Sequence, residues 1–206
     1  MRGQRMLVAR YKDRMNTDRT RSGTAATAWH YGTPAIALHW IIALLIFGMI
    51  ALGWTMMSIE KEPGAEVLFD LHKSFGLTVF GLIVLRILWR SGHRPEGLPD
   101  SVPAWQARLS MLSHWALYAC MIVMPITGYL GASHQKKPPK WFGFNLPNWA
   151  APDHDIAEAF FTVHSITTWV LVVLIALHTL AALKHLLMDR DGVFQRMWMG
   201  RRHQRT

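Results

Sequence analysis

The sequence is poor in cysteine, and this shortage narrows the chemistry open to it. Cys120 is the single cysteine, so the chain has no internal disulfide and no Cys-x-x-Cys spacing of zinc, iron–sulfur or dithiol redox sites. The C-x-x-C-H signature of covalent haem attachment is absent as well. Any metal centre must therefore use other ligands, and the sequence holds 11 histidines.

Charge is also scarce: charged residues make up 17% of the 206 residues, against 51% hydrophobic ones. The formal net charge is +9, but the basic residues gather in the termini and in alternate loops. They form no basic stripe interleaved with base-stacking aromatics, which argues against nucleic-acid binding. The composition is typical of a membrane protein with the length of one domain.

Four apolar stretches are long enough to cross a bilayer, which takes about 20 residues of helix. We expect helices at about 34–57, 68–89, 109–131 and 160–188, separated by an acidic loop, a Pro/Gly-rich loop and the segment 134–153. That last segment is too polar and proline-rich to span. Its aromatic residues suit an interfacial belt against lipid: Trp141, Phe142, Phe144 and Trp149.

The distribution of basic residues predicts the orientation of this all-α, transmembrane four-helix bundle. Counted with the helix ends that adjoin them, the two termini and the second loop hold 17 Lys and Arg, whereas the first and third loops hold 5. The positive-inside rule therefore places both termini on the cytoplasmic side of a bacterial inner membrane. We expect a basic, disordered tail at 1–30, the bundle at 31–190 and a second basic tail at 191–206.

Histidines recur at matching depths in this topology. His39 begins an outward helix and His178 ends an inward one, so both are expected near the cytoplasm. His72 and His164 each begin an inward helix, near the outer face. His164 and His178 lie about 21 Å apart along one helix and point within roughly 40° of each other. Ionisable groups inside a membrane are costly and usually face a bundle interior for a functional reason.

These depths predict two pairs, His39 with His178 and His72 with His164, each able to clamp a haem between facing helices. Imidazole is the commonest metal ligand in proteins. The alternative is that each histidine forms hydrogen bonds within the bundle or lies at its interface. Four histidines with concordant depth and facing favour two b-type haems.

The same 14-residue interval relates three further pairs, His39 with Gly53, His72 with Arg86, and His114 with Gly128. Arg86 is expected at the level of the inner haem, where it would neutralise a propionate. Gly53 and Gly128, with Gly76 one turn beyond His72, would let a flat ring approach the backbone, or would serve helix packing instead.

Two more histidines lie in the spans without a settled role. His114 is open to three interpretations: a quinone or propionate contact, a structural residue, or a ligand in place of His39. His185 shares a face with His178 and is expected to contact a propionate or a lipid headgroup. The remaining histidines are expected to be solvated: His30, His93, His134, His154 and His203.

From about Tyr31 to Met199 the sequence resembles the bacterial cytochrome b561 family. The matching stretches are AIALHWIIALLIFG, LHKSFGLTVFGLIVLRILWR, LSHWALYACMIVMPITGYL, WFGFNLP and VHSITTWVLVVLIALHTLAALKHL. The resemblance implies a four-helix cytochrome with two haem b groups ligated by His39, His72, His164 and His178. It also implies an activity known in the family, oxidation of superoxide at the outer face and reduction of ubiquinone.

Three functions remain open at this point. The first is a stand-alone oxidoreductase, with basic residues near the outer histidines steering an anion such as superoxide: Lys73, Lys136, Lys137 and Lys140. The second is a membrane-anchor subunit that passes electrons between a partner dehydrogenase or hydrogenase and quinone. The third is a haem-free transporter or scaffold, disfavoured because inverted repeats and intramembrane carboxylates are missing.

Overall fold

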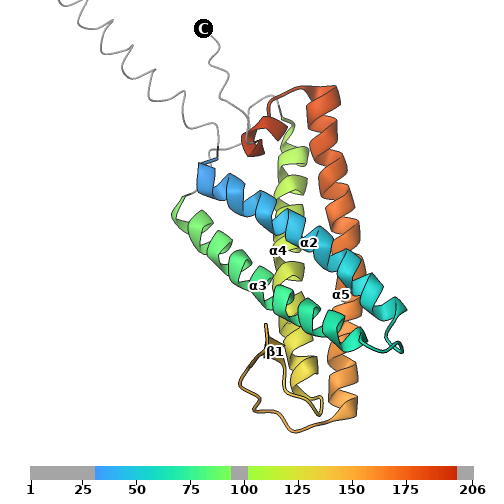
Figure 1. The fold of residues 1–206 in the computed structure, drawn as a ribbon. Helices are drawn as coiled ribbons and strands as arrows, with labels where there is room; N and C mark the ends of the chain where they lie inside the picture. The colour runs from blue at the N-terminus through green and yellow to red at the C-terminus, as the bar shows by residue number, and fades with distance from the viewer. Residues whose placement is uncertain (1–30, 94–101, 199–206) are drawn as a thin grey trace, which may run out of the picture.

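The computed structural model describes residues 31–93 and 102–198, and four long helices dominate this part of the chain (Figure 1). They are α2 (Thr33–Ser58), α3 (Ala65–Gly92), α4 (Ala104–Ser133) and α5 (His154–Lys184). Each is long and apolar enough to cross a membrane, which confirms the four predicted spans. The predicted tail at 1–30 lies outside the described residues.

Every helix begins earlier than the apolar pattern indicates, by one residue in α2 and by three to six residues in the other three. The carboxylate of Asp153 caps α5 by accepting a hydrogen bond from the backbone N–H of Ile156 at 3.0 Å. Gly64 precedes α3 with a φ of 89°, a left-handed conformation that glycine adopts without strain. Glu66, expected in the preceding loop, lies in the first turn of α3, where a negative charge suits the helix dipole.

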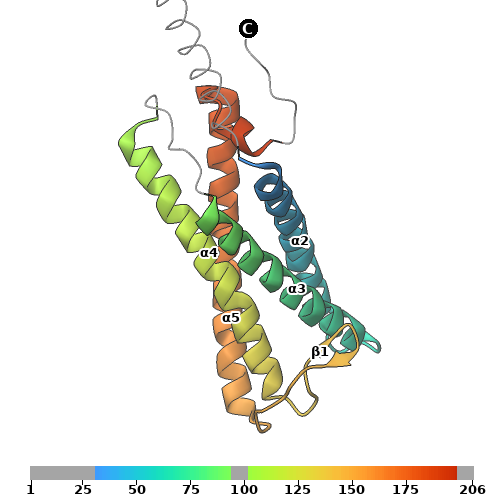
Figure 2. The ribbon, with the colours of Figure 1, turned by 90° about the vertical axis from the view of Figure 1, so that its left-hand side faces the viewer.

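The helices pack in two antiparallel hairpins, α2 with α3 and α4 with α5, which lie against each other (Figures 1 and 2). A small apolar cluster is centred on Ile42, Val79 and Ile83. Many other large apolar side chains are exposed, among them Leu44 and Trp169. That distribution suits a protein whose outer surface faces lipid instead of water.

A two-stranded hairpin, β1 (Lys140–Trp141) and β2 (Phe144–Asn145), lies in the connection between α4 and α5. Phe142 and Gly143 both have positive φ, as a two-residue type I′ turn requires. The turn is held on α3, because the backbone N–H of Phe142 donates to Ser74 Oγ at 2.9 Å. Trp141 Nε1 also donates to Thr78 Oγ1 at 3.2 Å.

The chain turns back on itself after α5. A short π-helix, η1 (His185–Asp189), is followed by a 3-10 helix, η2 (Phe194–Met197), which lies beside the start of α2 in Figure 1. Trp40 Nε1 donates a hydrogen bond to the carbonyl of Met197 at 2.7 Å. Of the predicted tail at 191–206, residues 191–198 therefore lie against the bundle, and 199–206 fall outside the described residues.

Candidate functional site

The structure brings four of the span histidines together in the two pairs that depth predicts. The ring centroids of His39 and His178 lie 6.3 Å apart, with an angle of 67° between the ring planes. Those of His72 and His164 lie 6.2 Å apart, at 68°. One ring of each pair comes from the α2–α3 hairpin and the other from α5.

Both separations leave room for one metal ion between the rings. Metal–imidazole bonds of about 2 Å would hold two ring centroids roughly 6 Å apart, which is the spacing of both pairs. Direct ring packing also occurs at such distances, so the spacing alone does not distinguish the two arrangements. The surroundings of His72 and His164, called the outer pair after their predicted position, do distinguish them.

One nitrogen of His164 is already bonded to the protein. Its Nδ1 lies 2.9 Å from the carbonyl oxygen of Met124 and 3.4 Å from Thr127 Oγ1. Because a carbonyl only accepts, Nδ1 must carry the proton, which leaves Nε2 unprotonated and able to bind a metal. A backbone carbonyl that orients a histidine in this way is the usual outer-shell partner of a metal ligand.

His72 has a buried ring nitrogen with no such partner. Its Nδ1 is buried and makes no hydrogen bond within the described part of the chain. An unpaired buried polar atom is uncommon in a protein core. This nitrogen lies on the side of Gly53, as Nδ1 of His164 lies on the side of Gly128, so Nε2 is the ring atom of His72 that is left to bind a metal. The residues of the outer pair therefore fit a metal-centred group.

Glycines make room for both outer histidines. A Cβ on Gly128 would lie 3.2 Å from His164 Cε1, and one on Gly53 would lie 3.4 Å from His72 Cε1. The two glycine positions share a second feature, because a methionine precedes each glycine by four residues: Met124 before Gly128, and Met49 before Gly53. These glycines thus bring helix backbone against the imidazoles themselves, an arrangement that the 14-residue interval indicated only in part.

Gly76 has a different neighbour. A Cβ there would meet Met49 Cε at 3.6 Å, an ordinary van der Waals distance. Its contact is thus a methionine side chain of α2, as in helix packing. A role in the approach of a ring stays a prediction.

Arg86 lies near His39 and His178, called the inner pair after their predicted position, and is held by two neighbouring helices. Its Nε donates to Tyr118 Oη at 3.2 Å and one Nη donates to the carbonyl of Ala35 at 2.8 Å. The guanidinium thus joins α3 to both α2 and α4. Neutralisation of a propionate by Arg86 stays a prediction.

His114 lies beside the inner pair. Its ring centroid is 5.4 Å from that of His178, closer than His39 is to the same ring. The structure therefore places His114 within the inner group, and the three interpretations given above, contact, structural residue and ligand, stay open.

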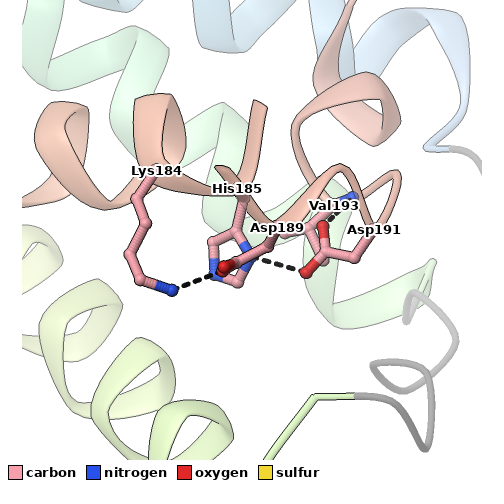
Figure 3. A network of polar contacts seen from close by, with 5 residues as sticks. All are labelled: Lys184, His185, Asp189, Asp191 and Val193. Carbon is pink, nitrogen blue, oxygen red and sulfur yellow. Dashed lines mark hydrogen bonds and ion pairs between the residues drawn. The ribbon is translucent and has the colours of Figure 1, made fainter. Parts of the chain in front are cut away.

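His185 belongs to a polar network at the end of α5 (Figure 3). Its Nδ1 lies 2.6 Å from one carboxylate oxygen of Asp191 and 3.3 Å from Asp189, which also pairs with Lys184. The other oxygen of Asp191 accepts from the backbone N–H of Val193 at 3.0 Å. This network fixes the turn that brings η2 back onto α2, and a headgroup or propionate contact for His185 stays a prediction.

An apolar layer separates the inner histidines from the outer ones. Ile42 lies between His39 and Gly53 along α2, and Val79 and Ile83 lie between His72 and Arg86 along α3. Bulky aliphatic side chains thus fill the middle of the bundle. They hold the two histidine pairs as two separate sites.

Sequence reasoning missed several residues of this site. Tyr118 and the carbonyls of Met124 and Ala35 give no pattern of their own, because a backbone acceptor has no sequence signature. Trp40 shows one weak signal, since a tryptophan directly follows both His39 and His114. Its ring meets His39 edge-on at 5.4 Å, next to its hydrogen bond with the end of the chain.

Comparison with known proteins gives concordant matches. Residues 30–200 match the family described as prokaryotic cytochrome b561. Cytochrome b561 homolog 2 of Escherichia coli K12 is 33% identical over 83% of this chain and 92% of its own length. Cytochrome b561 homolog 1 of the same organism is 27% identical over 79% and 93%. A probable superoxide oxidase, CybB of Yersinia pestis, is 26% identical over 81% and 94%.

Proposed function

Because the chain belongs to the prokaryotic cytochrome b561 family, whose members transfer electrons in membranes with haem b, we propose that it carries electrons across the bacterial cytoplasmic membrane, from a small donor outside to ubiquinone. The observation that carries this proposal is the presence of two histidine pairs at two depths of one bundle. Their ring centroids lie 6.3 and 6.2 Å apart.

His39 with His178 and His72 with His164 would hold two haem b groups, which supply one-electron redox chemistry when bound. The protein's own contribution is to orient these histidines and to make room beside them. The Met124 carbonyl sets the protonation and orientation of His164, and Gly53 and Gly128 let helix backbone approach the rings. The apolar layer around Ile83 keeps water out of the middle of the bundle.

Both termini face the cytoplasm in this proposal, in accord with the bias of basic residues towards the termini and the second loop. The pair His72 and His164 then lies near the outer face. The hairpin β1–β2 lies there as well, next to α3, since it bonds to Ser74 two residues beyond His72.

Superoxide is the donor that the outer surface favours. Lys136 and Lys137 are exposed and Lys140 is half-buried, whereas Lys73 is paired with Asp70 at 2.6 Å. Lys136, Lys137 and Lys140 make no ion pair within the described part of the chain, and three positive charges at one end would attract a small anion. The similarity to a probable superoxide oxidase supports the same donor.

The test uses the purified full-length chain. Its oxidised and reduced visible spectra establish whether haem is bound, and rapid mixing then follows haem reduction by superoxide and reoxidation by ubiquinone. Reduction should slow as salt rises, because the Debye length falls from about 30 Å at 0.01 M to about 10 Å at 0.1 M. Changing Lys136, Lys137 and Lys140 to Gln should slow it further.

Arg108→Gln is the matched control, since it removes a positive charge from an exposed position at the opposite end of the bundle. It should leave the rate of reduction by superoxide unchanged. A rate that ignores both salt and the lysine changes would remove the steering argument. Haems that superoxide does not reduce, but a co-purifying dehydrogenase does, would establish the membrane-anchor function instead.

A further inference from the structure

The two helix hairpins are joined in the same way at both ends of the bundle. At one end β1–β2, from the connection between α4 and α5, bonds to Ser74 of α3, two residues after His72. At the other end η2, which follows α5, bonds to Trp40 of α2, the residue after His39. Each time, a segment attached to α5 reaches across to the α2–α3 hairpin beside a predicted metal ligand.

The contact at Trp40 bears on the inner pair, because the two rings of that pair come from helices with different neighbours. His39 lies on α2, which packs on α3, and His178 lies on α5, which packs on α4. Near His39, the hydrogen bonds of Arg86 tie α2 to α3 and α4. The bond from Trp40 ties α2 to the chain that continues α5.

Trp40 contacts both a predicted ligand and the end of the described chain. Its ring meets the imidazole of His39 edge-on, with centroids 5.4 Å apart and 74° between the planes. It meets the ring of Trp198 in the same manner, at 6.0 Å and 86°, and its Nε1 donates to the Met197 carbonyl at 2.7 Å. Because packed side chains leave little free volume, an indole held in this way restricts the orientation of the imidazole beside it.

The segment that holds Trp40 is itself fixed to both helices (Figures 1 and 2). Towards α2, Arg196 is 5% exposed, and its guanidinium lies 5.2 Å from the centre of the Tyr31 ring, a cation–π contact with the chain just before the helix. Towards α5, Asp191 pairs with His185 Nδ1 at 2.6 Å and accepts from the Val193 N–H at 3.0 Å (Figure 3). The contacts therefore run without interruption from the end of α5 to the start of α2.

We propose that residues 185–198 form a clasp that sets the orientation of His39 in the inner pair, with Trp40 as the positioning residue that transmits its effect. This inference rests on the proposed function, since it concerns a ligand of the inner haem. It gives a role to a segment that lies beyond all four predicted ligands. The clasp keeps α2 and α5 at a fixed separation, and Trp40 keeps the imidazole of His39 at a fixed angle.

The experiment compares Trp40→Phe, which removes the N–H donor but keeps an aromatic ring, with the wild-type holoprotein. Hydrogen–deuterium exchange of the amides of residues 191–198 should become about tenfold faster, equivalent to ~1.4 kcal/mol, about the worth of one hydrogen bond. The electron paramagnetic resonance signal of a bis-histidine ferric haem depends on the angle between its imidazole planes. The signal of the inner haem should therefore shift, while that of the outer haem stays in place.

Asp191→Ala tests the clasp from its other end. It removes the acceptor of the Val193 N–H and the partner of His185, but it changes neither Trp40 nor His39. Exchange of the same amides should again become faster. The signal of the inner haem should shift in the same direction as in Trp40→Phe, because both variants release one clasp.

Trp115→Phe is the matched control, because Trp115 directly follows His114 as Trp40 follows His39, but it is 70% exposed. It should leave both measurements at their wild-type values. Faster exchange with an unchanged inner signal in Trp40→Phe would show that the clasp stabilises the fold only. A shifted signal without faster exchange would show that Trp40 acts on His39 without the clasp. Either result would overturn the inference.

The two measurements also separate this inference from the proposed function. Amide exchange requires no haem, superoxide or ubiquinone, so it reports on the clasp in any case. A wild-type protein without two bis-histidine haem signals would contradict the proposed function itself, and that result is obtained before any variant is compared.

Discussion

The two outer histidines differ in one hydrogen bond although their surroundings match. His164 bonds through Nδ1 to the carbonyl of Met124, four residues before Gly128, while His72 Nδ1 lies buried without a partner in the described residues. Met49 holds the corresponding place before Gly53. A small rotation of His72 towards the Met49 carbonyl would make the two halves equivalent, and we expect this rotation when the outer site is filled.

Pairing by depth gives the first prediction. His164→Ala should remove one ligand of the outer haem and leave the inner one six-coordinate, and His178→Ala should do the reverse. Low-temperature optical and electron paramagnetic resonance spectra distinguish the two components. His39→Ala should then perturb the same component as His178→Ala.

His114→Ala is the control for this set, since we expect it to retain both haems. Loss of a haem in that variant would make His114 a ligand. A common spectral change in His39→Ala and His164→Ala would show that the pairing is wrong.

Space at Gly128 gives the second prediction. In Gly128→Ala the new methyl group would lie 3.2 Å from Cε1 and 3.3 Å from Nδ1 of His164, so the imidazole must shift away from the Met124 carbonyl. We expect weaker retention of the outer haem and a cost of about 1–2 kcal/mol. Haem-to-protein ratio and thermal loss of the Soret band measure the two effects.

Gly81→Ala provides the comparison, because a Cβ at Gly81 meets nothing within 4 Å. It should keep full haem content and gain up to ~1 kcal/mol from its higher helix propensity. Equal haem loss in both variants would mean that helix flexibility, not space beside His164, explains the effect.

At the scale of elements, the outer hairpin depends on one buried serine. Ser74 is 1% exposed, donates to the carbonyl of Asp70 at 2.7 Å and accepts from Phe142. The hairpin is thus fixed to the turn of α3 that carries His72. Phe75 adds an edge-on contact with the Phe142 ring at 5.3 Å.

Loss of this attachment is the third prediction. Ser74→Ala leaves the Phe142 N–H without its acceptor, which should destabilise the hairpin by about 1–3 kcal/mol. Cleavage after Trp141 or Phe142 by chymotrypsin, applied from the outside, should become faster. Ser91→Ala is the control, because Ser91 is exposed and bonds only within its own helix; its cleavage rate should equal that of the wild type.

The sequence predicted the existence of the four helices better than their limits. Long apolar runs fix the membrane-crossing part, because only a helix or a closed barrel satisfies the backbone in lipid. The first turns depend on single capping groups such as Asp153, which hydropathy does not register. Depth and facing likewise predicted which histidines meet, while the partners of their second nitrogens, such as the Met124 carbonyl, come from packing that has no sequence pattern.

For the whole molecule, the fourth prediction concerns orientation. Cysteines replacing Glu62 and Asn148, both exposed in the first and third loops, should react with a membrane-impermeant thiol reagent in intact cells once Cys120 is changed to Ala. A cysteine replacing Arg108, exposed at the start of α4, should react only after the cells are opened. The opposite pattern would invert the protein and exchange the compartments that its two histidine pairs meet.

The last helix supplies a ring to each histidine pair, and this has a consequence for how the protein is made. As the chain leaves the ribosome, α2, α3 and α4 enter the membrane with only half of each site. The turn after α5 then bonds to Trp40, 157 residues upstream of its partner Met197. Cofactor capture must therefore be a late step of biogenesis, and a nascent chain arrested before His164 should incorporate no haem.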